Sequence, residues 1–590
     1  MSRLSRWRYD AILLAPLILL VGWPAAATLR EAIPPAYERE SGSGIFDRMR
    51  SVGNAEGQAL PPPDEAPLPP RAGGTTTGLL ARPSRLARET VILVAATEVV
   101  VMPIGLILAP LLFRTDVWGR NGVIALFLIA ALIPLPLLTT AWLGTLGNPG
   151  RLQAIGLRPL LVGRFGAVVI HTLAALPWVV LIAGVGFRTV ERELEESACL
   201  DLPPTIVWLR ITIRRALGAI AAAALTAAVL TAGEMTVTDL LQIRTYAEES
   251  YVQYSLGRGP AAAAAVALPP LLVLGSLIFT LALVLARADP HRVASSWLSS
   301  KTWELGKARR PLGALLLFMV GNLLLVPIYG LVWRAGRVGG KAPAGIPPPW
   351  RLEGLWGTIR MAAEESWEPL ATSLTAAFLA ATLAVMLAWP LVWRSRRSSI
   401  WRVLTLAIAA LLLAVPGPVA GMSLVLAYRE VPPVYDSLAI VVFAQAQRIL
   451  PYAILILWPA VRGISPRFLE NAAVDGFGEA RRVWNVALPL SRTAVGAAWL
   501  VGFVLAFGEL PATNLVQPPG VTLISFRIWS LLHTGVESHL AGVALVTLSV
   551  VVTVGLIAAL GLQRLALTIR RYASAGVFEG ERLTPPNQHP

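Results

Sequence analysis

The sequence has very little of several residue types on which soluble enzymes depend. Charged residues make up only 14% of the 590 residues, and there are one cysteine and five histidines, whereas about a quarter of a soluble chain is charged. The lone Cys199 excludes a disulfide framework within the chain. No stretch matches the phosphate-cradling Gly-x4-Gly-Lys-Ser/Thr motif, and the nearest, Gly340-Lys341, lacks both the earlier glycine and the following hydroxyl. We therefore predict no catalytic residue, no certain metal site and no cofactor bound by this chain.

Apolar residues, by contrast, make up 55% of the chain, and the mean hydropathy is +0.64. A helix of about 20 apolar residues is long enough to span a bilayer. Twelve apolar runs qualify, near residues 10–29, 91–113, 121–145, 161–187, 216–233, 261–286, 311–333, 368–394, 401–427, 438–462, 494–512 and 540–563. The sequence therefore predicts an all-α, polytopic membrane protein with about 12 transmembrane helices.

The net charge of +15 resides largely in short links between these runs. Arg and Lys residues gather in the links 114–120, 188–215, 287–310, 393–400 and 463–493, whereas the link 428–437 holds only Arg429. The positive-inside rule places the basic links and both termini in the cytoplasm, so the charge gives no reason to expect nucleic acid. Two interpretations of the first run stay open, an uncleaved span and a cleaved signal peptide, since Arg3, Arg6 and Arg8 precede it. The even number of spans favours the first.

The chain repeats itself in two halves, 1–300 and 301–590. Pro177, Arg188, Glu196, Ala198 and Asp201 recur 274 residues later as Pro451, Arg462, Glu470, Ala472 and Asp475. Gly233-Glu234 recurs as Gly508-Glu509 at an offset of 275, and Pro134-x-Pro136 as Pro416-x-Pro418 at 282. Six spans per half is an even number, so the copies face the same way, as parallel repeats. The long links 30–88 and 334–365 are expected outside the membrane.

One cytoplasmic link, 463–493, has the pattern of a helix, a glycine hinge and a second helix. Ser465 is expected to cap the first helix, with Pro466 at its first position. Gly476 ends that helix because glycine adopts the left-handed conformation at little cost. Leu488-Pro489 is expected to close the second helix. Such a pattern at a membrane surface suits the docking of a soluble protein, although an ordinary cytoplasmic loop with a Gly and a Pro is the alternative.

This link resembles the loop through which ABC-importer permeases bind their ATPase, which reads Glu-Ala-Ala, three residues, Gly, nine residues, Ile-x-Leu-Pro. The matching positions are Glu470, Ala472, Gly476, Val486, Leu488 and Pro489, whereas Asn471 departs from the pattern. The first half keeps Glu196, Ala198, Asp201 and Ile211, but Leu202 replaces the glycine and Arg214 the proline. Pro203 can still end that helix. This first copy is also expected to dock an ATPase subunit, with its first helix ended by Pro203 rather than by a glycine.

The resemblance implies a type I permease of the bacterial cytoplasmic membrane, with its cores at about 88–286 and 368–565. Its implied partners are two cytoplasmic ATPase subunits, which would use the ATP, and an extracytoplasmic solute-binding protein. Gly508 to Thr513, Pro518-Pro519-Gly520 and Leu532 to Gly535 are similar to the ferric-iron importer permeases. The resemblance covers roughly 88–565. Related permeases for thiamine, polyamines, phosphonates or sulfate are the alternatives.

Ionisable residues inside apolar runs are the candidates for a solute pathway. Glu98, His171 and Arg448 lie deep in their runs, and Gln445 is the repeat partner of His171. Glu234 and Glu509 recur in both halves near the expected outer mouth, where carboxylate oxygens would suit ferric iron. For each residue a structural role is the alternative: polar groups satisfying one another between helices, or, for the glutamate pair, the capping of a re-entrant turn.

The rival from another functional class is a secondary transporter, which also uses two six-helix repeats. Such a transporter needs no ATPase dock, so the link around Glu470 argues against it. A purely structural membrane subunit is a more distant alternative.

Overall fold

The computed structural model describes residues 14–32, 81–147, 157–255, 271–280, 282–283, 302–337, 349–534, 537–554 and 556. Within these ranges the protein is helical, and its one β-type pairing is an isolated bridge between Thr115 and Trp303. Among the residues that the structure describes, eight helices are long and apolar enough to cross a membrane, and two bent helix pairs raise this number to as many as ten. The predicted all-α, polytopic membrane class is confirmed.

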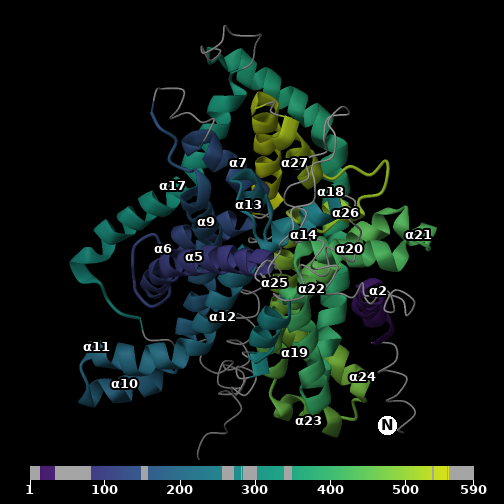
Figure 1. The fold of residues 1–590 in the computed structure, drawn as a ribbon. Helices are drawn as coiled ribbons and strands as arrows, with labels where there is room; N and C mark the ends of the chain where they lie inside the picture. Colours follow the sequence, from purple (N-terminus) through teal and green to yellow (C-terminus); the bar gives the residue numbers. More distant parts are fainter. Residues whose placement is uncertain are drawn as a thin grey trace, which may run out of the picture.

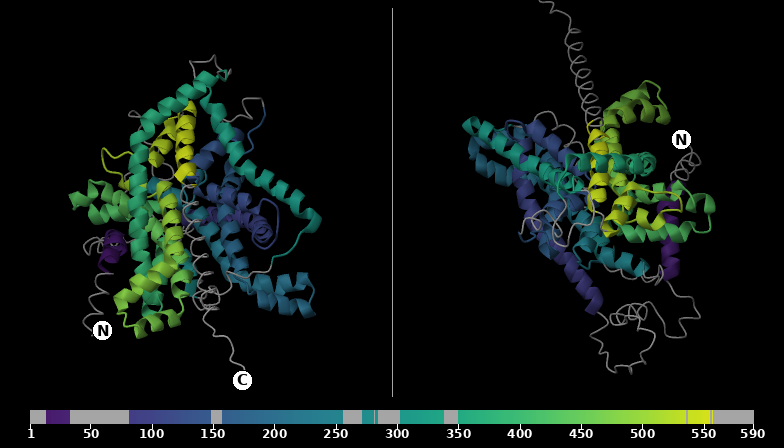
Figure 2. Two further views of the ribbon diagram at one scale, coloured as in Figure 1. Left: turned by 180° about the vertical axis from the view of Figure 1, so that it is seen from behind. Right: turned by 90° about the horizontal axis from the view of Figure 1, so that it is seen from above.

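Three long helices pack together at the centre of each half (Figures 1 and 2). They are α5 (Ala81–Phe113), α9 (Gly163–Arg188) and α12 (Ile213–Ala232) in the first half, and α18 (Leu352–Ser395), α22 (Leu438–Arg462) and α25 (Leu488–Phe507) in the second. Small residues at every fourth position of α18, Ala376, Ala380, Ala384 and Ala388, are almost fully buried. Small side chains let membrane helices approach closely, so van der Waals packing stabilises this core.

The expected spans 121–145 and 401–427 are sharply bent rather than straight. They form the pairs α6 (Arg120–Leu132) with α7 (Leu135–Leu146) and α19 (Ser399–Ala414) with α20 (Gly417–Tyr428), bent by 102° and 108°. Ile133 and Val415 are extended at the bends, with ψ of 120° and 121°. Each precedes a proline of the repeated Pro-x-Pro, and the proline ring disfavours a helical conformation in the residue before it.

Two further predicted spans coincide with shorter apolar helices. Leu14–Thr28 falls in the first run, and Leu271–Thr280 falls in the run 261–286, of which residues 261–270 lie outside the described ranges. The first helix packs on α20: Trp23 Nε1 donates to Ala427 O at 2.8 Å, and Tyr428 donates its hydroxyl to Leu19 O at 2.8 Å.

The two links expected to be docking loops lie at the same end of the molecule, the lower end in Figure 1. The first holds α10 (Arg192–Asp201) and α11 (Pro204–Val207), and the second holds α23 (Pro466–Val474) and α24 (Glu479–Arg482). Each is followed by one π-helical turn, η3 (Trp208–Thr212) or η5 (Val483–Ala487), at the repeat offset of 275 residues. The repeat in the sequence is thus also a repeat of local structure.

Candidate functional site

A cavity of about 170 Å³ lies where the two halves meet. The first half contributes the bend before α7, the middle of α9 and the end of α12, and the second contributes α22 and the end of α25. Four of the six residues predicted to face a solute line it: His171, Glu234, Arg448 and Glu509. Glu98 on α5 and Gln445 on α22 are not among its lining residues. The structure thus brings together residues that lie far apart in the sequence, while their role in transport stays a prediction.

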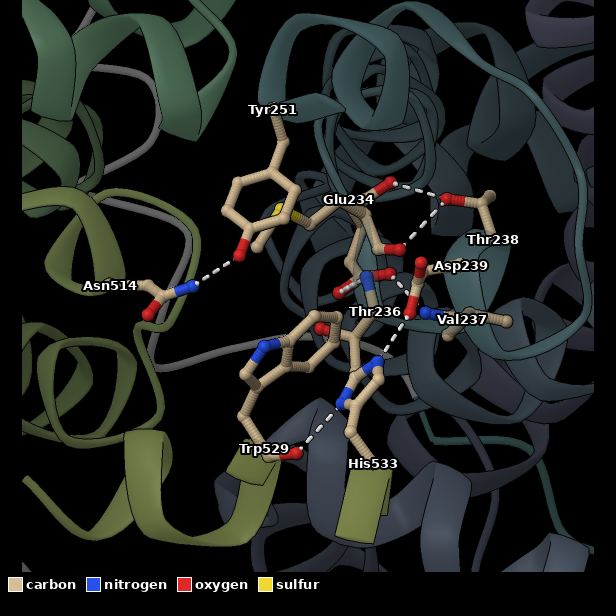
Figure 3. Close-up of polar contacts among 10 residues, drawn as sticks. Glu234, Thr236, Val237, Thr238, Asp239, Tyr251, Asn514, Trp529 and His533 are labelled. Carbon is tan, nitrogen blue, oxygen red and sulfur yellow. Dashed lines mark hydrogen bonds and ion pairs between the residues drawn. The ribbon is translucent and has the colours of Figure 1, made fainter. Parts of the chain in front are cut away.

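The two repeated glutamates cap the short helices that follow them. Glu234 accepts the N–H groups of Thr236 and Val237 at 2.7 and 2.9 Å, at the start of α13 (Thr236–Leu240; Figure 3). Glu509 accepts the N–H groups of Ala512 and Thr513 at 2.8 and 2.9 Å, at the start of α26 (Thr513–Val516). The first N–H groups of a helix have no partner within it, so each carboxylate satisfies two of them. The capping role left open by the sequence is therefore present, at the wall of the cavity.

Arg448 is the cation at this cavity. Its Nη1 donates to Val415 O at 2.7 Å. That carbonyl precedes Pro416, at the bend where α19 ends. Arg448 also lies close enough to Glu509 to interact with its charge. The repeat offset of 274 places Ala174 at the corresponding position of the first half, so the two halves contribute two carboxylates but one guanidinium. With both carboxylates ionised, this asymmetry would give the cavity wall a net negative charge.

His171 and Gln445, which the repeat pairs, are both buried polar residues of the core helices. His171 Nε2 and Gln445 Oε1 make no hydrogen bond within the part of the chain that the structure describes, and neither does Glu98 Oε1. Buried polar atoms without partners are costly. Whether these residues face a solute stays a prediction.

Near Glu234, side chains of both halves meet in contacts that the sequence did not predict (Figure 3). Asn514 Nδ2 donates to the Tyr251 hydroxyl at 3.0 Å, and His533 Nε2 lies 3.1 Å from Asp239 Oδ2. Tyr251 also makes an edge-to-face contact with Trp529 at 6.2 Å. These residues belong to α14 (Tyr246–Ser255), α13, α26 and α27 (Ile524–Thr534). The sequence resemblance had singled out Leu532 to Gly535, which includes His533, but it predicted none of these contacts between the halves.

Proline and glycine allow the halves to approach at the cavity. A Cβ atom on Gly508 would lie 2.9 Å from Cβ of Pro134, which belongs to the other half. Such a distance is too short for two carbon atoms, so a side chain at position 508 would push the halves apart. Pro134 and Pro511 line the cavity. The repeated Pro-x-Pro was the available signal, but it was interpreted only as a mark of duplication.

The second loop has the predicted helix, glycine hinge and helix. Gly476 has φ +82°, and the N–H groups of Gly476 and Phe477 donate to Ala473 O and Ala472 O at 3.1 and 2.9 Å. Ser465 is the N-cap residue of α23 and Pro466 its first helical residue, as predicted, although the Ser465 side chain makes no capping hydrogen bond. The expectation about the end of the second helix was wrong. Leu488-Pro489 does not close the second helix, because the turn η5 leads directly into α25, and proline is tolerated in a first turn.

The first loop differs in how its helix ends and in what anchors it. Leu202 is extended, with φ −129° and ψ 143°, before Pro203, so the proline ends α10 as expected. Glu196, the motif residue, is exposed and pairs with Arg192 at 2.7 Å. Its neighbour Glu195 is instead fully buried, where its carboxylate accepts hydrogen bonds from Arg114 Nη2 and, at 2.6 Å, from the Thr212 hydroxyl. Sequence reasoning missed Glu195, because Leu469 stands at its repeat position.

Comparison with known proteins gives partial matches to transport permeases. The chain is 26% identical over 99 residues to the spermidine/putrescine transport system permease protein PotC of Escherichia coli, covering 17% of this chain and 38% of the relative. It is 27% identical over 152 residues to the putrescine transport system permease protein PotI of the same species, covering 25% and 54%. The sn-glycerol-3-phosphate transport system permease protein UgpA of Shigella dysenteriae is 29% identical over 127 residues, covering 20% and 43%.

These matches relate parts of the chain to proteins named as transport system permeases. No family model matches the chain, and the matched stretches span about half or less of each relative's length. The apolar helices of the described residues by themselves indicate a multi-pass membrane protein.

Proposed function

We propose that this chain is the membrane permease of an ATP-driven importer, with two six-helix halves at 1–300 and 301–590 around one solute path. The observation that carries this proposal is the cavity between the halves, with a repeated glutamate from each half in its wall. The paired loops at one end of the molecule would receive two ATPase subunits in the cytoplasm. The opposite end would face the solute-binding protein, and both termini would lie inside. Glu470, Ala472, Gly476, Val486, Leu488 and Pro489 form the proposed principal dock, and Glu196, Ala198 and Asp201 the second.

For the solute we propose a cation, with ferric iron as the first candidate. Glu234 and Glu509 outnumber Arg448 at the cavity, so its field would favour a cation over an anion such as sulfate. Carboxylate oxygens are suitable ligands for ferric iron. In the part of the chain that the structure describes, however, no group of three or more His, Cys, Asp or Glu side chains is placed to hold a metal ion. Any iron would therefore pass this cavity with few protein ligands.

A protonated polyamine is the second candidate, because two of the relatives are named for spermidine or putrescine transport. Polyamines are organic cations that need charge complementarity rather than a metal-coordination sphere. The same pair of carboxylates would attract them.

Uptake assays distinguish these solutes. Cells that lack their own iron and polyamine importers would express the chain with its binding protein and ATPase, and would receive radiolabelled ferric iron or radiolabelled spermidine. We expect iron uptake that stops when the ATPase is inactivated. Uptake of spermidine alone would select the second candidate. Uptake that continues without the ATPase would identify a secondary transporter and contradict the proposed function.

Removing the two capping carboxylates is expected to lower uptake strongly. In the double variant Glu234→Gln/Glu509→Gln, each amide keeps one acceptor oxygen and turns an NH2 group toward a backbone N–H. One donor per helix then loses its partner, at about 1–3 kcal/mol each, and the cavity loses both negative charges. We expect uptake to fall about tenfold or more, measured with permease abundance in the same membranes.

The matched variant Glu234→Asp/Glu509→Asp separates charge from capping. It keeps both charges but withdraws each carboxylate from the helix that it caps. Uptake retained by the aspartate pair and lost by the glutamine pair would show that charge at the cavity matters for transport. If uptake by both double variants falls only in proportion to the lower permease abundance, the two glutamates have a structural role only.

A further inference from the structure

The second half contains a cluster of arginines. In the first half, the corresponding arginine is paired with a buried carboxylate of the same half. Arg114 and Arg396 are repeat partners, each just beyond the inner end of a core helix, α5 or α18. In the first half Arg114 is fully buried, and the carboxylate of Glu195 binds its guanidinium. At the positions of Glu195 and Thr212, the second half has Leu469 and Ala487, both buried apolar residues. The second half thus lacks both the carboxylate that binds Arg114 and the hydroxyl that donates to that carboxylate.

A cavity of about 390 Å³ lies beside Arg396, between the ends of α18 and α22 and the helices α23 and α24. We call it the arginine pocket. Its lining residues are Arg396, Arg397, Arg462, Pro466, Leu469, Glu470 and Arg482. Four guanidinium groups thus face one carboxylate. Outside the lining, Glu479 approaches Arg397 at 3.9 Å through an exposed ion pair, which contributes little. The pocket therefore carries a clear excess of positive charge.

The cations of the arginine pocket lie close enough to affect one another. Burial, together with the charges of Arg397 and Arg462, lowers the pKa of the Arg396 guanidinium to about 10. Arg396 Nη2 donates to a neutral acceptor, Ile464 O, at 2.6 Å. Arg482 Nε is buried and makes no hydrogen bond to the residues that the structure describes. An anion in the pocket would relieve this repulsion and supply acceptors.

The position of the pocket at the ends of two membrane helices indicates which anions can reach it. Arg396 and Arg462 lie over the rings of Trp393 and Trp458, each at 4.7 Å from the ring centroid, where two membrane helices end. Tryptophan and arginine gather at this depth, level with lipid headgroups. Basic pockets between membrane helices on the cytoplasmic side bind anionic headgroups, and the planar fork of arginine matches phosphate oxygens in pairs. We propose that the arginine pocket binds a phosphate group, supplied by the headgroup of an anionic phospholipid or by free inorganic phosphate.

The test uses the purified full-length chain, stripped of lipid and titrated with phosphatidylglycerol or phosphatidylcholine under native mass spectrometry. The pocket variant Arg397→Gln/Arg482→Gln removes two lining charges. Its matched control, Arg467→Gln/Arg481→Gln, removes two charges from exposed positions of α23 and α24 outside the lining. Because each lost charged hydrogen bond weakens binding by about tenfold or more, we expect the pocket variant to bind phosphatidylglycerol at least about tenfold more weakly. The control should change less than about twofold, and phosphatidylcholine binding should not change.

A second arm adds inorganic phosphate alone and follows thermal unfolding of the chain in phosphatidylcholine nanodiscs. No shift of Tm with phosphate, together with the expected lipid result, identifies the headgroup as the source. A Tm shift that the pocket variant abolishes and the control keeps identifies free phosphate. If the glutamine variant does not fold, Arg397→Lys/Arg482→Lys keeps the charge but loses the fork, and phosphatidylglycerol binding should fall about threefold.

Equal phosphatidylglycerol binding by the pocket and control variants, with no phosphate effect, would overturn the proposal. So would a pocket variant that binds lipid normally but no longer retains the ATPase, because the arginines would then serve a protein contact. Neither readout involves transport, so the result is independent of the solute.

Discussion

Replacing Glu195 with alanine is expected to destabilise the protein by about 3–5 kcal/mol, the typical cost of removing one partner from a buried ion pair. The side chains of Arg114 and Glu195 have no exposed surface, and Arg114 Nη1 also donates to Phe187 O at 2.7 Å. Without the carboxylate, a guanidinium would stay buried at the C-terminal end of α5, and the Thr212 hydroxyl would lose its acceptor. Thermal unfolding in detergent and the abundance of the chain in membranes measure this loss.

The neighbouring residue provides the control for this substitution. Glu196→Ala removes the same group one position along α10, where the ion pair with Arg192 is about half exposed on both sides. Exposed pairs contribute little to stability, so Tm should stay nearly unchanged. Glu195→Gln keeps an acceptor for Thr212 but removes the charge, and it should fall between the two. A Glu195→Ala chain as stable as Glu196→Ala would show that the buried pair does not anchor the first loop.

Substituting proline for Gly476 is expected to uncouple ATP hydrolysis from transport. The φ of +82° at this position is closed to proline, which requires about −65°. Proline also lacks the N–H that Gly476 donates to Ala473 O. The end of α23 would therefore change direction and move α24 away from the proposed dock. In proteoliposomes with the ATPase and the binding protein, we expect solute-stimulated ATP hydrolysis to fall about tenfold or more, since a forced backbone change costs about 3 kcal/mol.

Gly478→Pro is the matched control, two residues away in the same loop. Gly478 has φ −63°, which already suits proline, and a Cβ atom there meets nothing within 4 Å. Stimulated hydrolysis should therefore be close to that of the unchanged chain. Normal coupling in Gly476→Pro would count against the ATPase-docking role of this loop, whereas equal losses in both variants would mean that the loop tolerates no proline at all.

The features predicted correctly are those with local causes. Gly476 was expected to end a helix because glycine can adopt positive φ, and it does so. Pro203 was expected to end α10, and the residue before it is extended. The same local reasoning failed for Leu488-Pro489, because the π-helical turn η5 continues directly into α25. Ser465 is the N-cap residue of α23, as predicted, but its side chain makes no capping hydrogen bond.

The sequence by itself determined the helical membrane class, the duplicated halves and the residue at which the first helix of each docking loop ends. Apolar runs, fixed offsets and turn residues act over one helix or one turn, so they are readable along the chain. Only the tertiary structure decided that His171, Glu234, Arg448 and Glu509 line one cavity, and that Glu195 rather than Glu196 neutralises Arg114. Those contacts depend on how helices far apart in the sequence pack against one another. The buried carboxylate of Glu195 needs a charged partner, whereas the exposed carboxylate of Glu196 does not. A charge removed from water costs free energy unless an opposite charge or hydrogen-bond donors compensate it.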